Sequence, residues 1–172
     1  SFQQAVQIKY RSATLHISRS GGTAVYLCII FDLYSRKIIG WRVSRHMSMD
    51  LVTTIFKMAF QERDKSQNLS STVTGAASNM KDFAALLQQC DVKQFFSATA
   101  GPLDNAVAET LFSTFKREKA YQREYTSEQH FRRSTEEYIQ FYNEVRLHTT
   151  LQYKTPQALK DFYNSVSQKS GV

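Results

Sequence analysis

The sequence predicts one α/β domain spanning residues 1–172, with a sheet that begins as an antiparallel meander and continues through helical crossovers. A hydrophobic content of 42% and a charged content of 22% are typical of a globular domain that buries a core. The predicted order of elements is strand, strand, strand, helix, strand, helix, strand, helix, helix. Strands alternating with helices in the middle of the chain favour crossover connections and an α/β sheet.

The first part of the chain carries the strand signals. A weak strand, "ATLHIS" (13–18), precedes "AVYLCIIFDLYSRKIIGWRV" (24–43), which reads as two β-rich runs around a hairpin-like "DLYSRK". The first of these runs is continuously apolar, which predicts that both of its faces are covered. An amphipathic helix is then expected over 48–66, with Ser48 as N-cap. Its predicted apolar stripe consists of Leu51, Ile55, Met58 and Ala59.

The middle of the chain predicts shorter elements. We expect a short strand at 70–75, a helix at 78–90 and a further strand at 91–97. The apolar positions that indicate the helix are Met80, Phe83, Leu86 and Leu87.

The C-terminal part is helical. Ser127 is expected to cap a helix over 127–145, and Thr155 a second one that has Pro156 at its first position. The longer helix has a stripe that we expect to be core: Phe131, Tyr138, Phe141 and Tyr142.

The segment 101–118, "GPLDNAVAETLFSTFKRE", begins as a loop and continues as a helix over 104–119. Helical steps of 100° place Asn105, Glu109, Ser113 and Lys116 on one face, away from an apolar stripe of Val107, Leu111 and Phe115. Glu109 therefore lies on the polar side. Lys116, two turns further on, could meet a phosphate on that same side.

The charge and the composition of the chain favour some classes of function over others. The net charge of +7 and the pI near 9.5 favour a polyanionic partner, with nucleic acid ahead of a membrane surface. The longest apolar run, 24–31, is far below the roughly 20 residues that cross a bilayer, and no secretory pattern is visible, so we expect a cytoplasmic, non-membrane protein. We interpret Cys28 and Cys90 as buried free thiols. The histidines are too scattered to indicate zinc by spacing: His16, His46, His130 and His148.

Three ordered motifs together resemble a known family. "DLYSRKIIGW" (32–41), "GPLDNAVAETLFSTFKRE" (101–118) and "YIQFYNEVRLHTTLQYKTPQAL" (138–159) are similar to the integrase catalytic core of bacterial insertion-sequence transposases, which are related to retroviral integrases. The resemblance covers about residues 12–163. It implies a ribonuclease H-like fold, with a five-stranded mixed sheet whose first three strands are antiparallel and with helices on both faces.

The same resemblance implies chemistry on DNA. Family members cut and join DNA with two Mg²⁺ or Mn²⁺ ions held by two aspartates and one glutamate, the D-D-E triad. Glu109 matches the glutamate. The first aspartate position falls on Ala13, with Thr14 as the alternative, and the second falls on Val73. Residues 1–31 contain no Asp or Glu, and none lies between Lys65 and Lys81.

The sequence therefore predicts a catalytically inactive core. One carboxylate cannot neutralise a pair of dications, so we expect no bound metal, or at most one at Glu109 alone. The leading prediction is binding to the DNA phosphate backbone with weak sequence specificity, through Lys116, Asn105, Arg117 and Lys119.

Two other functions stay open at this point. One is a non-catalytic module, derived from a transposase, whose function is self-association into a homo-oligomer. The other retains activity by recruiting Asp32, Asp104 or His16 to a metal.

Overall fold

The computed structural model describes residues 6–17, 23–32, 34–46, 48–61, 69–73, 93–95, 102–122 and 124–169. The helix predicted over 78–90 lies outside these residues. Among the helices of the described ranges, none has the length and apolar content to cross a bilayer.

Five strands in this described part form one sheet, in the order β3-β2-β1-β4-β5. The first three, β1 (Val6–Ile17), β2 (Thr23–Asp32) and β3 (Ile38–Ser44), are antiparallel neighbours. The other two, β4 (Leu69–Val73) and β5 (Lys93–Phe95), run parallel to β1. The antiparallel meander of β1, β2 and β3 is thus followed by a parallel part of the sheet, formed by β4 and β5 beside β1.

The first strand is longer than the sequence pattern predicts. It begins at Val6, whereas the expected strand began at residue 13, so the predicted start was wrong. The reason is tertiary: β1 is central, pairing with β2 from Ile8 onward and with β4 up to Tyr10. Partners on both sides satisfy the backbone of the polar segment "QIKYR", which has little strand signal of its own.

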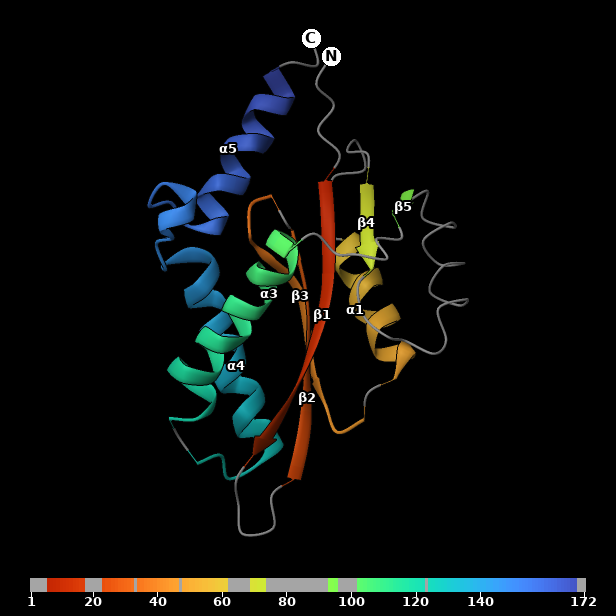
Figure 1. The fold of residues 1–172 in the computed structure, drawn as a ribbon, viewed down its shortest axis with the longest axis vertical. Coiled ribbons are helices and arrows are strands. Elements are labelled where there is room, and N and C mark those ends of the chain that lie inside the picture. The colour runs from red at the N-terminus through yellow and green to blue at the C-terminus, as the bar shows by residue number, and fades with distance from the viewer. Residues whose placement is uncertain are drawn as a thin grey trace.

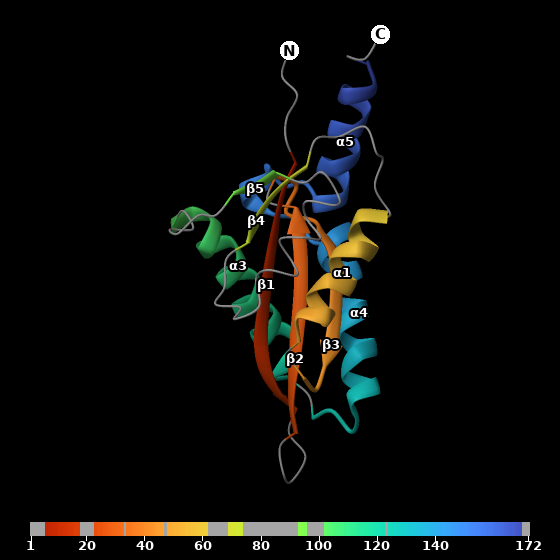
Figure 2. The ribbon, with the colours of Figure 1, turned by 90° about the vertical axis from the view of Figure 1, so that its right-hand side faces the viewer.

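Helices cover both faces of the sheet (Figures 1 and 2). One face carries α1 (Met49–Gln61), and the other carries α3 (Pro102–Phe115) and α4 (Glu128–Glu144). The π-helix η1 (Lys116–Ala120) follows α3, and the 3₁₀ turn η2 (Thr149–Leu151) leads into α5 (Pro156–Lys169). The predicted caps are confirmed: Ser48 Oγ accepts from Leu51 N at 3.3 Å, Ser127 Oγ from His130 N at 3.1 Å, and Thr155 Oγ1 from Ala158 N at 3.1 Å.

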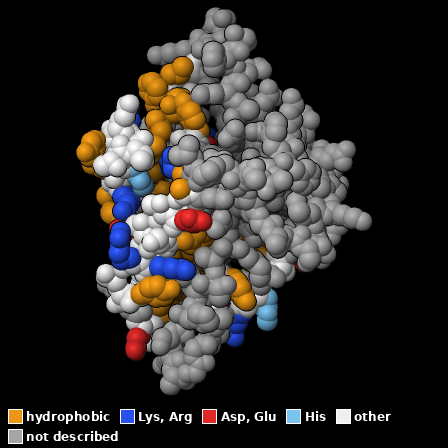
Figure 3. Space-filling view, in the orientation of Figure 1, with side chains coloured by type: hydrophobic (Ala, Val, Ile, Leu, Met, Phe, Trp, Pro, Cys, Tyr) orange, Lys and Arg blue, Asp and Glu red, His pale blue; other side chains and the backbone are white. Residues whose placement is uncertain are grey.

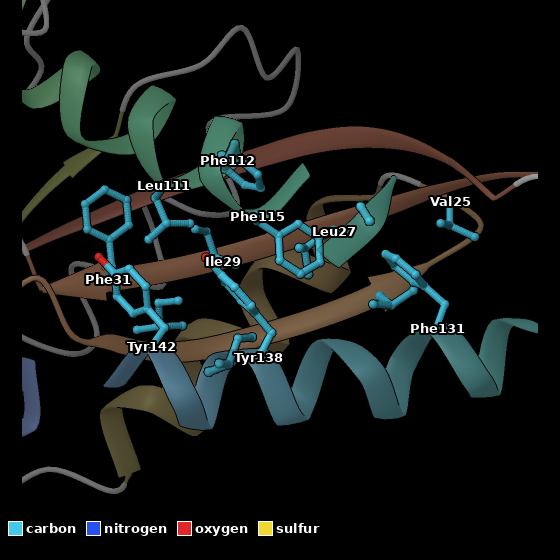
Figure 4. Close-up of a cluster of buried hydrophobic side chains, with 14 of the residues drawn as sticks. Val25, Leu27, Ile29, Phe31, Leu111, Phe112, Phe115, Phe131, Tyr138 and Tyr142 are labelled. Atoms are coloured by element: carbon cyan, nitrogen blue, oxygen red, sulfur yellow. The ribbon is translucent and has the colours of Figure 1, made fainter. Parts of the chain in front are cut away.

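The main core lies between β2 and the helices α3 and α4 (Figure 4). Alternate β2 residues, among them Leu27 and Ile29, pack in one buried cluster with Phe115 of α3 and Tyr138 of α4. The intervening residues Cys28 and Ile30 are also fully buried, as the apolar run predicted for a strand covered on both faces. On the α1 side the packing is close: a Cβ at Gly40 would lie 2.8 Å from Ile55 Cγ2.

Two residues of the predicted stripes are exposed. Met58 of α1 is 45% exposed and Phe141 of α4 is 43% exposed, so their assignment to the core was wrong. Each lies roughly 100° around its helix from the centre of the buried arc, just past the edge of that arc. Of the other predicted stripe residues, Ile55, Ala59, Phe131, Tyr138 and Tyr142 are buried, as expected. The buried residues that the pattern did not include are Val52 and Phe56 on α1, and Ser134, Thr135, Ile139 and Asn143 on α4.

Candidate functional site

The helix that carries Glu109 has the two faces that its sequence predicts. Leu111 and Phe115 are buried in the core, and Val107 packs partly against it. Glu109 and Ser113 are exposed on the opposite side. Asn105 belongs to the same helix, one turn before Glu109. The carboxylate is thus held at the surface by a helix whose other face is anchored in the core.

The end of α3 widens into a π-turn. The N–H of Tyr121 donates to the carbonyl of Lys116 at 2.9 Å, the i to i+5 pattern of a π-helix. Phe115 before the turn and Ala120 within it are both buried. Between these anchors the wider turn opens a shallow hollow at the surface, lined by Ser113, Lys116, Arg117, Tyr121 and Gln122.

The hollow is basic and partly aromatic. The side chain of Arg117 is 74% exposed and Tyr121 is 65% exposed. Figure 3 shows Lys and Arg side chains beside exposed hydrophobic ones on the side of the molecule where α3 lies. Two of the predicted nucleic-acid-binding residues, Lys116 and Arg117, are therefore brought together.

Lys119 is directed elsewhere. Its Nζ lies 3.4 Å from Glu137 Oε2 of α4, and its side chain is only 22% exposed. The π-turn separates Lys119 from Lys116 and Arg117, since all three residues lie within this five-residue turn and point to different sides of the helix axis. Lys119 does not line the hollow.

Ionic contacts fix the turn against the C-terminal motif. Arg146 donates to Glu118 Oε2, and the hydroxyl of Tyr138 donates to the same oxygen at 3.3 Å. Burial, followed by the nearby Glu118 carboxylate, raises the pKa of Tyr138, and the hydrogen bond that Arg146 donates to Glu118 raises the pKa of Arg146. Tyr125 adds a hydrogen bond of 2.8 Å to the carbonyl of Lys119. Sequence reasoning missed this network, whose members are up to 28 residues apart.

A second unforeseen contact joins α4 to the hairpin. Asn143 Nδ2 donates to the carbonyl of Ile38 at 2.9 Å, and Asn143 Oδ1 accepts from the Ile38 N–H at 2.9 Å. Both residues are buried. The amide thus continues the hydrogen bonding of β3 from a helix 105 residues away in sequence.

The two assigned aspartate positions lie on neighbouring strands. Ala13 pairs with Leu27 on β2, whereas Val73, the last residue of β4, pairs with Tyr10, three positions before Ala13 on β1. Three residues correspond to about 10 Å along a strand and to alternate faces of a sheet. The assignment of Ala13 and Val73 therefore stays a prediction from the sequence pattern, as does the alternative Thr14, which pairs with Tyr26.

Asp32, a candidate for recruitment to a metal, has a structural partner. Its Oδ2 lies 2.7 Å from Lys160 Nζ of α5, and its Oδ1 accepts from the N–H of Tyr34 at 3.0 Å. Asp104 belongs to the first turn of α3, and His16 to β1. Within the described ranges, no three His, Cys, Asp or Glu side chains are grouped so that they could hold a metal ion.

Comparison with known families agrees with this architecture. Two models described as "Integrase core domain" match residues 9–102 and 90–156. The first covers more than half of the chain, and this chain belongs to the integrase core domain family. Its fold is therefore the ribonuclease H-like α/β fold of that family.

Curated relatives are transposases of bacterial insertion sequences. The transposase for insertion sequence element IS904 of Lactococcus lactis is 32% identical over 154 residues, which are 87% of this chain and 59% of that protein. The putative transposase for IS150 of Escherichia coli is 28% identical over 136 residues, 78% of this chain and 48% of that protein. The chain thus spans about half the length of the curated relatives that it matches.

Solved structures share the fold at low sequence identity. The catalytic core domain of BIV integrase superposes with a TM-score of 0.68 at 12% identity, covering 96% of this chain and 98% of that one. A chain of the simian T-cell lymphotropic virus intasome gives a TM-score of 0.65 at 11% identity, over 88% of this chain and 53% of that one. The likeness to retroviral integrases is therefore one of fold.

Proposed function

We propose that this chain is an integrase core of the transposase type that binds DNA but does not cut or join it. The observation that carries the proposal is the scarcity of acidic residues. Only Glu109 of the three positions assigned to the triad is a carboxylate, while the other two are Ala13 and Val73. We further propose that the five-stranded sheet with helices on both faces is the unaltered scaffold of the family.

The donor set does not fit a pair of divalent cations. Mg²⁺ and Mn²⁺ take hard oxygen ligands, and two such ions about 4 Å apart need several carboxylates to offset their repulsion. The side chains of alanine and valine supply no oxygen ligand. Glu109 alone, exposed on α3, leaves most of the positive charge uncompensated.

DNA binding survives the loss of the acids because it depends on different side chains. Lys116 lies on the Glu109 face of α3, and Arg117 lines the same hollow. Guanidinium and ammonium groups bind phosphate oxygens without regard to base sequence. The net charge of +7 adds a long-range attraction to the polyanion.

A nicking assay tests the proposed inactivity. Supercoiled plasmid incubated with the protein and Mn²⁺ or Mg²⁺ is expected to stay intact, as it does with Glu109→Gln. Isothermal titration with Mn²⁺ is expected to show no difference between the two proteins. Nicking that needs a divalent cation and is lost in Glu109→Gln would refute the inactive site.

Salt-dependent binding tests the interface. The logarithm of the affinity for duplex DNA is expected to fall linearly with the logarithm of the salt concentration, because phosphate contacts release counterions. Lys116→Gln should reduce that slope by about 0.9, the contribution of one phosphate contact on duplex DNA. The matched control is Lys57→Gln, the same charge change at an exposed site on the opposite face of the sheet. Equal slopes for the two variants would place the interface elsewhere.

Self-association is the second candidate function, favoured by exposed apolar residues near the end of α4 and along α5. Large exposed hydrophobic patches mark interaction sites in soluble proteins. Sedimentation over a range of protein concentrations, without DNA, distinguishes this function, since a module for self-association forms dimers or larger species by itself. The exposed residues in question are Phe141, Val145, Leu147, Tyr153, Phe162 and Val166.

A further inference from the structure

The hollow after α3 contains an exposed aromatic ring, that of Tyr121. Tyr121 is 65% exposed, and among the described residues its ring stacks on no other aromatic ring. Lys116 beside it forms no ion pair with a described carboxylate. Arg117 lies 4.0 Å from Glu118 but keeps most of its guanidinium side chain in solvent.

A ring flanked by cations matches the chemistry of an unpaired nucleotide. A base that has left the double helix exposes its π-face, which stacks on tyrosine, while its phosphates need positive partners. Bases inside a duplex stack on each other and offer no such face. Ser113 and Gln122 at the rim add hydroxyl and amide groups that can hydrogen-bond to a base edge.

We propose that the hollow lined by Lys116, Arg117 and Tyr121 binds one unpaired nucleotide of a DNA strand, with its base stacked on Tyr121 and its phosphates contacted by the two cations. The proposal rests on the proposed DNA-binding function and refines it. Stacking on the Tyr121 ring makes the hollow prefer single-stranded over duplex DNA, a preference that the two cations alone do not provide.

The place of the hollow relates it to Glu109. Ser113 lies one turn along α3 from Glu109, and Lys116, the first residue of η1, lies about two turns from it, which corresponds to about 6 Å and 10 Å along the helix axis. A nucleotide in the hollow therefore brings the adjoining part of its strand close to Glu109. Such a surface favours a strand end or a distorted region over continuous duplex.

The hollow is also held in shape before any ligand arrives. The Lys116 carbonyl accepts a hydrogen bond from the Tyr121 N–H. The contacts of Glu118 with Arg146 and Tyr138 connect the turn to α4 and the residues that follow it. A surface that is already ordered loses little entropy when it binds.

Fluorescence anisotropy with labelled oligothymidylate and with a duplex of equal length, at low salt, tests the proposal. Tyr121→Ala is expected to weaken single-strand binding by about 5- to 150-fold, the range measured for losing one stacked base. Duplex binding should change less than about two-fold, since phosphate contacts supply most of it. Tyr121→Phe should bind both like the unaltered protein, because stacking needs the ring and not the hydroxyl. Tyr34→Ala, which removes another exposed ring, is the matched control.

Photocrosslinking gives a direct readout. An oligonucleotide that carries 5-iodouracil should crosslink to Tyr121, identified by mass spectrometry of the peptide. If single strands and duplex both bind but Tyr121→Ala weakens them equally or not at all, the stacking site is wrong and DNA binding stands. If neither DNA binds at low salt, the proposed function fails together with this inference.

Discussion

Replacement of Asn143 by alanine is expected to destabilise the fold strongly without changing the residues of the proposed DNA-binding hollow. The Asn143 amide satisfies both backbone groups of Ile38 at 2.9 Å. Ile38 is 4% exposed, so water does not readily replace the lost partner. Leaving one buried polar group unsatisfied costs about 1–3 kcal/mol, so the two groups together cost about 2–6 kcal/mol. This is a large part of the about 5–15 kcal/mol that stabilises a typical domain.

Urea unfolding followed by tryptophan fluorescence measures this loss. Trp41, the single tryptophan of the chain, lies in β3 and packs partly against the core, so its emission reports on this hairpin. Gln140→Ala, an exposed change on the same helix, should cost less than about 0.5 kcal/mol. Asn143→Asp keeps an acceptor for the Ile38 N–H but places an oxygen against the Ile38 carbonyl, so it should also destabilise. A loss below about 1 kcal/mol for Asn143→Ala would refute the assigned role.

Three further changes probe the scaffold. Lys160→Met leaves the buried Asp32 carboxylate without its partner and should cost about 3–5 kcal/mol in chemical unfolding, which Asp32→Asn in the same chain should largely restore. Gly40→Ala places a Cβ 2.8 Å from Ile55 Cγ2 and 3.3 Å from the Ile55 carbonyl oxygen, and should cost about 1–3 kcal/mol; an unchanged Tm would contradict the close packing. Burial, followed by the charges of Arg146 and Arg36, lowers the pKa of His148 despite a hydrogen bond to the Tyr142 backbone. The fold therefore favours neutral His148, and stability should fall as the pH drops from about 6.5 through the lowered pKa. In His148→Phe, urea unfolding at neutral and acidic pH should show a smaller loss of stability on acidification, because the phenyl ring does not titrate. An identical pH dependence in the two proteins would refute the role given to His148.

The sequence predicts local elements well where local chemistry decides them. Ser127 and Thr155 begin their helices as expected, because an N-cap hydroxyl and the helix it precedes are neighbours in the chain. The division of α3 into a polar and an apolar face follows in the same way from helical geometry. Phe141 was misplaced because its exposure depends on how far the covering elements extend, which a helical pattern does not contain.

Contacts between distant segments are outside the reach of such patterns. The long start of β1 depends on β4, and the pair of Asn143 and Ile38 depends on the docking of α4. The π-turn after α3 results from anchoring Phe115 and Ala120 in the core at a spacing that a regular α-helix does not meet. For the same reason the exposed ring of Tyr121 could not be assigned to the candidate site from its sequence neighbours.

Scaffold and chemistry are separable in this domain, because they depend on different residues. The core is built from apolar side chains of β2, α3 and α4, and the C-terminal motif holds the hairpin and the turn through Asn143 and Arg146. None of these contacts needs the two aspartates that the family motif places near the sheet. Removing mutually repelling carboxylates from one site costs the fold little and relieves like-charge repulsion when no metal is bound. The absence of acids at Ala13 and Val73 therefore leaves the basic hollow beside Glu109 in place, and DNA binding is the property that we propose this arrangement retains.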